Sequence, residues 1–290
     1  MKQLKLGIPK GSLESATVDL FAQAGWTIWY RSRNYFPSID DDEIACSLVR
    51  SQEMGPYVAG GTMDAGLCGI DWIKETQADV EVVCDLVYSK ASDQPSRWVL
   101  VVDQDSLVRK VEDLEGKVIS TELVGYTRRY LEERGINATV EFSWGATEAK
   151  VVEGLADAAV EITETGTTIK AHGLRIVCDL LHTHTVLVAN KDALADPWKK
   201  AKIDQIALML QSALAARHRV LLKMNAPTEA LDEVTKLLPS LHAPTVNHLT
   251  DSAWVAIETV VERREVRDLI PKLRTAGAEG ILELDLKNLS

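Results

Sequence analysis

The sequence has no long apolar run. Nowhere in its 290 residues does it approach the roughly 18 consecutive apolar residues that a membrane-spanning helix needs. Residues 1–13 alternate charged and apolar side chains and lack the apolar centre of a signal peptide. These absences exclude a membrane protein as the expected class and predict a cytoplasmic one.

Positive charge is in the minority. The chain carries 32 Lys and Arg against 43 Asp and Glu, which gives a formal net charge of −11. A field of this sign repels nucleic acid and anionic lipid, so neither is expected as a partner. A phosphorylated ligand would therefore have to be held by local geometry.

Cysteine is scarce and lacks the CxxC spacing of zinc sites. The four residues are Cys46, Cys68, Cys84 and Cys178. Three of them lie in apolar, strand-like runs, which predicts buried, reduced thiols. The histidines cluster only at His182 and His184, on one face of a predicted strand. This pair could begin a metal site, but no third ligand is evident, which favours a solvent-facing strand.

Several catalytic motifs are also missing. The chain contains no Walker A motif, no GxGxxG, no GxSxG nucleophile elbow and no helical HExxH. No nucleophile and base stand at a recognisable spacing. Chemistry that proceeds through a covalent enzyme intermediate is therefore not indicated.

The residues that are present predict a globular α/β protein. Apolar residues make up 46% of the chain and charged residues 26%, which is ordinary for a protein of two or three domains. Short apolar runs alternate with amphipathic segments, which predicts a largely parallel, doubly wound sheet. The predicted strands are Leu4–Ile8, Ala65–Gly69, Val80–Val87, Trp98–Val102, Lys117–Ser120 and Ala158–Ile162.

Two interruptions divide this α/β region into two lobes. The polar segment Ser89–Arg97 offers almost nothing to bury and reads as a crossing between lobes. A second crossing is predicted within Ile176–Thr185, where polar residues break an apolar run. Two lobes joined by two crossings leave a cleft between them.

From about residue 216 the pattern changes to β-α-β-β-α-β. Strands are predicted at Val220–Met224, Thr245–Leu249, Trp254–Val261 and Ile281–Leu286. Apolar residues at helical spacing lie in the two intervening helices. This order is typical of a ferredoxin-like domain.

The segment from Ala158 to Thr168 is the most informative one. A small apolar strand delivers Glu161 and Glu164 into a turn rich in threonine and glycine, followed by a helix start. Backbone N–H groups and hydroxyls of such a turn can bind phosphate, and the carboxylates can accept hydrogen bonds from ribose hydroxyls. An ordinary capped turn remains the alternative.

Three further loops are expected at the same crevice, because the carboxyl ends of parallel strands meet there. The first is Gly7–Leu13, which contains Lys10, Gly11 and Ser12. The second, Asp64–Asp71, has glycines around a short strand, and Asp71 is either a helix cap or a ligand. The third is Ser143–Glu148.

Taken together, these segments resemble the long form of the ATP phosphoribosyltransferase family, the first committed enzymes of histidine biosynthesis. The resemblance covers nearly the whole chain. Its motifs are Pro9–Gly11, Asp64–Asp71, Arg97–Leu100, Gly154–Asp157, Glu161–Thr168, Ala226–Thr228, Ala243–Val246 and Gly277–Leu282. It implies a two-lobed, periplasmic-binding-protein-like catalytic core followed by a ferredoxin-like regulatory domain. The implied domains are residues 1–92 with 178–215, residues 93–177, and residues 216–290.

By this resemblance, the reaction joins N1 of the ATP adenine to C1 of phosphoribosyl pyrophosphate and releases pyrophosphate, with Mg²⁺ held by the pyrophosphate and not directly by the protein. Adenine is the nucleophile, so none is needed from the protein. The residues implied for phosphoribosyl pyrophosphate are Glu161, Thr163, Glu164, Thr165, Gly166, Thr167 and Thr168, with Glu161 on the ribose hydroxyls. Those implied for ATP or pyrophosphate are Lys10, Gly11, Ser12, Asp71 and Arg97.

Two positions depart from the family pattern. Ser12 stands where arginine is common, so a positive charge near the leaving group is missing or comes from elsewhere. Glu161 stands where aspartate is common and is one methylene longer.

The third domain of long-form members binds histidine as a feedback inhibitor, and these enzymes shift between dimers and hexamers. The matching effector positions are Asn225, Leu241, Thr245 and Gly280. The alternative to an enzyme is a cytosolic bilobal binding or sensor protein without chemistry, because two lobes with double crossings also describe solute receptors.

Overall fold

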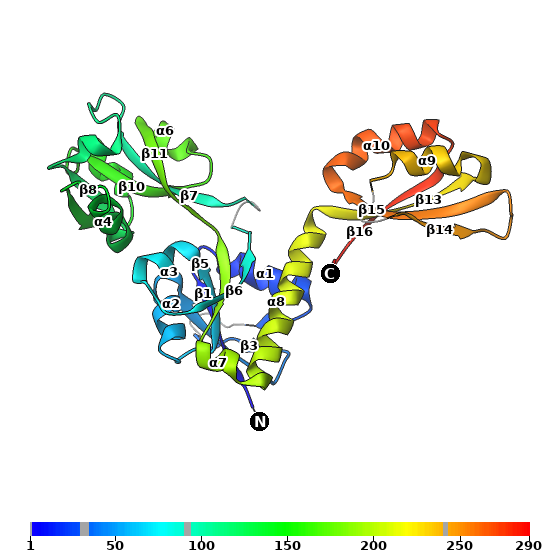
Figure 1. The fold of residues 1–290 in the computed structure, drawn as a ribbon, viewed down its shortest axis with the longest axis horizontal. Helices are drawn as coiled ribbons and strands as arrows, with labels where there is room; N and C mark the ends of the chain where they lie inside the picture. The colour runs from blue at the N-terminus through cyan, green and yellow to red at the C-terminus, as the bar shows by residue number, and fades with distance from the viewer. Residues whose placement is uncertain (1, 30–34, 90–93, 240–242) are drawn as a thin grey trace. The chain divides into compact units, whose positions relative to one another are not determined.

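The computed structural model describes residues 2–29, 35–89, 94–239 and 243–290 (Figure 1). The chain divides into two compact units. The first contains residues 1–22 and 26–207, and the second contains residues 23–25 and 208–290. The long helix α8, Pro197–Arg217, runs across the boundary between them.

The first lobe of the first unit is built on a five-stranded sheet with the order β4-β1-β5-β12-β6. Its strands are β1 (Leu4–Lys10), β4 (Ile44–Arg50), β5 (Ala65–Gly69), β6 (Glu81–Leu86) and β12 (Thr185–Ala189). The associated helices are α1 (Glu14–Ala24), α2 (Ser51–Ala59), α3 (Ile70–Thr76) and α7 (Lys191–Ala195), and a small hairpin pairs β2 (Ile28–Trp29) with β3 (Ser38–Ile39). Central strands such as β12 are buried along their whole length, which explains their unbroken apolar sequence.

The second lobe has a five-stranded sheet with the order β11-β7-β10-β8-β9. Its strands are β7 (Ser96–Asp103), β8 (Val118–Thr121), β9 (Thr139–Phe142), β10 (Ala158–Thr163) and β11 (Leu174–Thr183). Its helical segments are the 3₁₀ turn η1 (Val111–Leu114), α4 (Val124–Glu132), α5 (Thr147–Val152) and α6 (Thr167–Ala171). A core that includes Leu100, Ile119 and Val160 lies within this lobe.

The two-lobed α/β architecture is confirmed, but the sheets are not wholly parallel. In the first sheet β12 is antiparallel to β5 and β6, and in the second sheet β7 is antiparallel to β10 and β11. Both are the strands by which the chain enters a lobe after crossing from the other one. A chain that enters from the cleft begins its strand at the carboxyl edge of the parallel strands, and therefore runs against them.

The crossing predicted within Ile176–Thr185 is confirmed, since β11 pairs in the second sheet and β12 in the first. Of the crossing predicted at Ser89–Arg97, residues 90–93 lie outside the described residues, and Ser96 already begins β7. The elements that were not predicted from the sequence include β4, α2 and β9.

The second unit has the predicted β-α-β-β-α-β order. It comprises β13 (Arg219–Pro227), the 3₁₀ turn η2 (Thr228–Ala230), α9 (Leu231–Leu237), β14 (Thr245–His248), β15 (Trp254–Glu262), α10 (Arg263–Thr275) and β16 (Glu279–Asp285). The antiparallel sheet has the order β14-β15-β13-β16, and both helices cover one of its faces (Figure 1). Val234 from α9 and Leu273 from α10 pack with Leu222 of the sheet in one buried core. The ferredoxin-like prediction is confirmed.

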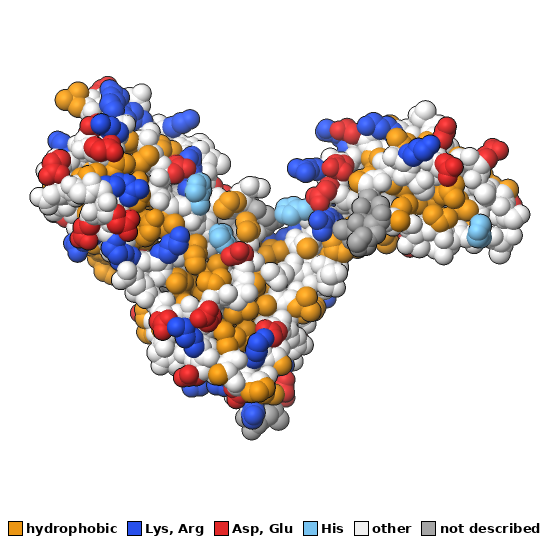
Figure 2. Space-filling model, in the orientation of Figure 1, with side chains coloured by type: hydrophobic (Ala, Val, Ile, Leu, Met, Phe, Trp, Pro, Cys, Tyr) orange, Lys and Arg blue, Asp and Glu red, His pale blue; other side chains and the backbone are white. Residues whose placement is uncertain are grey.

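None of the helices in the described part of the chain combines the length and the apolarity that crossing a membrane requires. On the face drawn in Figure 2, acidic and basic side chains lie interspersed over both units. That face offers no extended cationic surface to a polyanion.

Candidate active site

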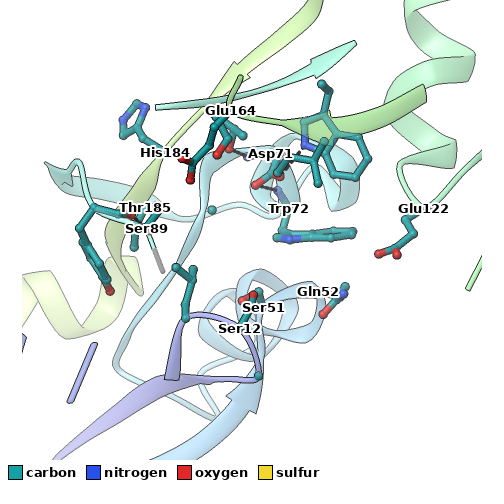
Figure 3. Close-up of a pocket in the computed structure, with 18 of the residues that line it drawn as sticks. Ser12, Ser51, Gln52, Asp71, Trp72, Ser89, Glu122, Glu164, His184 and Thr185 are labelled. Carbon is teal, nitrogen blue, oxygen red and sulfur yellow. Dashed lines mark hydrogen bonds between the residues drawn. The ribbon is translucent and has the colours of Figure 1, made fainter. Parts of the chain in front are cut away.

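A cavity of about 520 Å³ lies between the lobes of the first unit and is lined by residues from both sheets (Figure 3). On the first lobe, the lining follows the carboxyl ends of three strands. It contains Lys10–Leu13 from the end of β1, Arg50–Gln52 from the end of β4, and Gly69, Asp71 and Trp72 from the end of β5. The second lobe contributes Glu122, Glu161, Ile162 and Glu164, and the crossing segments contribute Tyr88, Ser89 and Thr183–Thr185. This is the crevice at the carboxyl ends of parallel strands that the topology predicts.

Six of the residues selected from the sequence line this cavity together: Lys10, Gly11, Ser12, Asp71, Glu161 and Glu164. The remaining members of the threonine-glycine turn, Thr163 and Thr165–Thr168, are not among the lining residues and adjoin the cavity at Glu164.

Glu161 ends the buried part of β10, and its carboxyl group lines the cavity. Burial raises its pKa to about 7, and the negative charges of Glu148 and Glu122 act in the same direction. A hydrogen bond with Thr147 opposes the shift. Burial also raises the pKa of Glu122, a second carboxyl group of the cavity. A cationic or metal-bearing ligand close to these two carboxyl groups would stabilise their ionised forms.

The turn after β10 has a defined internal geometry. Gly166 is buried with a φ of +77°, and a Cβ added there would lie 3.1 Å from Cδ1 of Ile176. Its N–H donates to Oγ1 of Thr163 at 2.9 Å, and the hydroxyl oxygens of Thr165 and Thr167 are 2.8 Å apart. Thr165, Thr167 and Thr168 are exposed. Glycine is thus required at position 166 of the turn. The hydroxyl groups of the three threonines lie at the surface of the turn.

Asp71 is buried at the base of the cavity, with only 2% of its surface exposed. Its Oδ2 accepts the indole N–H of Trp98 at 2.7 Å, and its backbone N–H donates to Oγ1 of Thr183 at 3.3 Å. Burial raises the pKa of Asp71, while these polar contacts act against the shift. The cap of α3 is Gly69, so Asp71 lies inside the first turn and is not the helix cap.

Lys10 and Gly11 form the start of the first loop. The Lys10 ammonium lies 3.8 Å from the centre of the Tyr35 ring, a cation–π contact. Gly11 has a φ of +111°, and its N–H donates to Glu14 at 3.3 Å. Arg50 at the end of β4 lines the same cavity and brings the second cation to it.

Arg97 lies outside the cavity lining. Its guanidinium forms an ion pair with Asp179, with N–O distances of 2.7 and 3.0 Å. The structure therefore separates Arg97 from the other candidates for phosphate pairing.

His182 and His184 contact different carboxylates. His184 lines the cavity and its Nε2 lies 2.8 Å from Asp85, whereas Nε2 of His182 is 3.7 Å from Asp179. Within the described ranges no group of three or more His, Cys, Asp or Glu residues could hold a metal ion, and all four cysteines are free thiols.

Several lining residues were not predicted from the sequence, among them Arg50, Ser51, Gln52, Trp72 and Glu122. The first three stand where β4 passes into α2, and neither element was predicted. The alternation of Ile44, Cys46 and Leu48, all buried, is the signal that would have found the strand.

The proposed effector positions lie in the second unit. Asn225 is exposed on β13, Thr245 is exposed on β14, and Gly280 is in β16 with a φ of +57°. Leu241 lies outside the described residues.

Comparison with known proteins places the chain in one family. A family model described as "ATP phosphoribosyltransferase" matches residues 50–212, and one described as "HisG, C-terminal domain" matches residues 216–288. An ATP phosphoribosyltransferase of Geotalea uraniireducens is 62% identical over 286 residues, which are 99% of this chain and 98% of the relative. ATP phosphoribosyltransferase 1 of Geobacter sulfurreducens is 60% identical over the same shares.

This chain belongs to the ATP phosphoribosyltransferase family. Because both models match, it is a long-form member with the family's C-terminal regulatory domain, and its reaction is the first step of histidine biosynthesis. A solved structure of the "ATP phosphoribosyl transferase (HisG:HisZ) complex" from Thermotoga maritima is 28% identical. It aligns with a TM-score of 0.63 over 73% of this chain and 99% of that chain.

Proposed function

We propose that the cavity binds phosphoribosyl pyrophosphate and ATP and transfers the phosphoribosyl group to adenine N1. The observation that carries this proposal is the composition of the cavity. It combines a half-buried carboxylate, Glu161, beside a threonine-glycine turn of one lobe with two cations, Lys10 and Arg50, of the other. A sugar that carries a phosphate at one end and a pyrophosphate at the other fits this distribution of charge.

Phosphoribosyl pyrophosphate would lie along the second lobe. Glu161 would accept hydrogen bonds from the ribose hydroxyls, and the turn from Thr163 to Thr168 would hold the 5-phosphate through exposed hydroxyls and backbone N–H groups. Thr163 already supports the turn by its bond to Gly166. A hydrogen bond from a neutral donor to an ionised phosphate is stronger than a hydrogen bond between two neutral groups. Such donors can bind a phosphate without positive charge from the protein.

The pyrophosphate would lie toward the first lobe. Lys10, Gly11 and Ser12 would meet it, and Arg50 would provide the charge that Ser12 lacks. Asp71 would hold the side chain of Trp98 in place by accepting a hydrogen bond from its indole N–H. Arg97 has no place in this arrangement because its charge is paired with Asp179.

Magnesium would enter with the substrate. The carboxylates of the cavity do not form a cage for an ion in the described residues, and Mg²⁺ keeps its waters and favours substrate phosphates. The residues of the cavity therefore suit an ion that the substrate carries. Glu164 could accept a hydrogen bond from a water molecule bound to that ion. The ion would neutralise charge on the leaving pyrophosphate.

The chemistry then needs alignment and charge balance. The lone pair of adenine N1 forms a bond to C1 while the bond from C1 to the pyrophosphate oxygen breaks, and pyrophosphate leaves with the bonding electrons. Ionised Glu161 would stabilise the positive charge that develops on the sugar, and Lys10 and Arg50 the negative charge on the leaving group.

We further propose that residues 1–92 with 178–215 and residues 93–177 act as the catalytic lobes, and residues 216–290 as the regulatory domain. Histidine would bind there near Asn225, Thr245 and Gly280 and inhibit the enzyme. Inhibition would require histidine to favour one arrangement of a dimer or hexamer over another. The proposal includes a cytoplasmic enzyme with no nucleic-acid or membrane partner.

The test is to mix the protein with ATP, phosphoribosyl pyrophosphate and Mg²⁺ and to follow the absorbance of the phosphoribosyl-ATP adduct. Thr165→Val should raise KM for phosphoribosyl pyrophosphate by the equivalent of about 1.5–3 kcal/mol. Thr139→Val, at an exposed site on β9, should leave it unchanged. Binding of both substrates without product would instead identify a sensor without chemistry.

A further inference from the structure

We propose that Trp72 and Gln52 form the adenine subsite of this cavity and recognise the N6–N7 edge of the base, which leaves N1 free to react. The assignment rests on the function proposed above and adds to it the residues that select adenine. Neither residue belongs to the motifs on which the family resemblance was based.

Trp72 presents an aromatic surface that is held in place. It is half-buried in the first turn of α3 and lines the cavity (Figure 3). Its ring meets that of Trp98 edge-on, with 6.1 Å between ring centroids and an interplanar angle of 88°. Trp98 is only 3% exposed and donates its indole N–H to the buried Asp71. A flat base can therefore stack on Trp72 without a large loss of side-chain freedom.

Gln52 supplies polar groups that no described residue satisfies. It is the second residue of α2, is exposed, and lines the same cavity as Trp72 (Figure 3). Its side chain makes no hydrogen bond within the described part of the chain. A glutamine amide offers one acceptor and a donor side by side. Adenine offers the complement on its N6–N7 edge, where N6 donates and N7 accepts.

The reaction itself decides which edge of the base can be bound. Attack by N1 requires its lone pair to face C1 of the sugar, so a protein group bonded to N1 would block the reaction. Recognition through N6 and N7 avoids this conflict. Trp72 and Gln52 belong to α3 and α2 of the first lobe, whereas Glu161 belongs to β10 of the second. The base and the sugar would thus be held by different lobes and meet between them.

The test uses 7-deaza-ATP, in which a C–H replaces N7 while N1 and N6 are retained. With the full-length wild-type enzyme, KM for 7-deaza-ATP should be about fivefold higher than KM for ATP, the value of one lost hydrogen bond. Gln52→Leu should raise KM for ATP by a similar factor and abolish the difference between the two nucleotides. Gln104→Leu, at an exposed site outside the cavity, should preserve the difference.

Stacking is tested by Trp72→Phe and Trp72→Leu. KM for ATP should rise slightly with phenylalanine and about tenfold or more with leucine, while KM for phosphoribosyl pyrophosphate stays within twofold. ATP should quench tryptophan fluorescence of the wild type, and the quenching should be lost in Trp72→Phe. A residue that only packs against Trp98 would lower stability without this separation of the two KM values.

The outcomes separate the two proposals. Product from ATP together with equal KM values for ATP and 7-deaza-ATP, or a difference that persists in Gln52→Leu, overturns the subsite alone. No product from ATP in the wild type overturns the proposed function, and the subsite with it.

Discussion

The carboxylate of Glu75 in α3 accepts the backbone N–H of Gly125 in α4 at 2.7 Å, so a side chain of one lobe caps a helix of the other. Its second oxygen accepts the N–H of Tyr126, also at 2.7 Å. In return, Arg129 of α4 donates to the carbonyl of Lys74 and, at 3.3 Å, to that of Glu75. Each charge meets the helix end of opposite polarity. Gly125 permits the approach, since a Cβ there would lie 3.2 Å from the Glu75 carbonyl oxygen.

We expect Glu75→Gln to lower the free energy of unfolding by about 1–2 kcal/mol, because one oxygen and the negative charge are lost from the N-terminus of α4. Urea denaturation at neutral pH measures this change. Glu141→Gln, an exposed position on β9, serves as the control and should stay within about 0.5 kcal/mol of the wild type. Equal stability of both variants would show that the contact contributes nothing.

Glu161 should make stability depend on pH. Its pKa is raised from 4.5 to about 7 in the folded protein, so the folded state binds this proton more tightly than the unfolded state. The resulting stability is fully present below pH 4.5 and is lost as the pH rises through 7. Glu161→Gln removes this loss, and we expect it to gain about 2 kcal/mol relative to the wild type between pH 5 and pH 8. Urea denaturation at both values tests the sign, and a constant difference would contradict it.

The pH dependence of activity should move when a neighbouring charge is removed. Ionised Glu161 is the form that can bind the ribose hydroxyls, so kcat/KM for phosphoribosyl pyrophosphate should rise with pH through about 7. Among the neighbouring charges, that of Glu148 raises this pKa the most. Glu148→Gln should therefore shift the acidic limb of the profile to lower pH. Glu153→Gln, exposed at the end of α5, should leave the limb in place, and a limb unmoved in Glu148→Gln would exclude Glu161 as its source.

Asp71 should be replaceable by asparagine but not by leucine. Asparagine retains an oxygen for the indole N–H of Trp98 and removes a buried charge, so stability should stay close to that of the wild type. Leucine leaves the Trp98 N–H without an acceptor in a buried site, which should cost about 1–3 kcal/mol. Thermal unfolding of the two variants measures the difference. Equal losses would mean that the charge of Asp71, and not its hydrogen bond, matters.

The order of strands and helices could be predicted because most elements follow a strong apolar pattern. The strands β1, β5 and β10 are buried, short and bounded by polar loops. In contrast, α2 contains Pro56, which interrupts the helical pattern, and β9 has only Val140 buried among its four residues. These elements depend on tertiary packing, and local sequence carries little sign of it.

The site was predictable where chemistry is local in sequence. The turn from Thr163 to Thr168 and the carboxylate of Glu161 could be selected because strand, glycine and hydroxyls follow one another directly. The residues that pair with the candidate side chains or shift their pKa values could not be predicted, because they are distant in the sequence. The Arg97–Asp179 and Asp71–Trp98 contacts join residues 82 and 27 positions apart. The pKa of Glu161 likewise depends on Glu122 and Glu148, whose proximity only the folded chain determines.

A single residue, His184, separates β11 of one sheet from β12 of the other, and it lines the cavity. The backbone therefore changes sheets at a residue whose side chain faces that space. A rotation of one lobe relative to the other would change the backbone torsion angles at His184. A ligand in contact with this segment would oppose that rotation. The segment that connects the two sheets is therefore also part of the cavity wall, so the angle between the lobes and the occupation of the cavity are coupled at this residue.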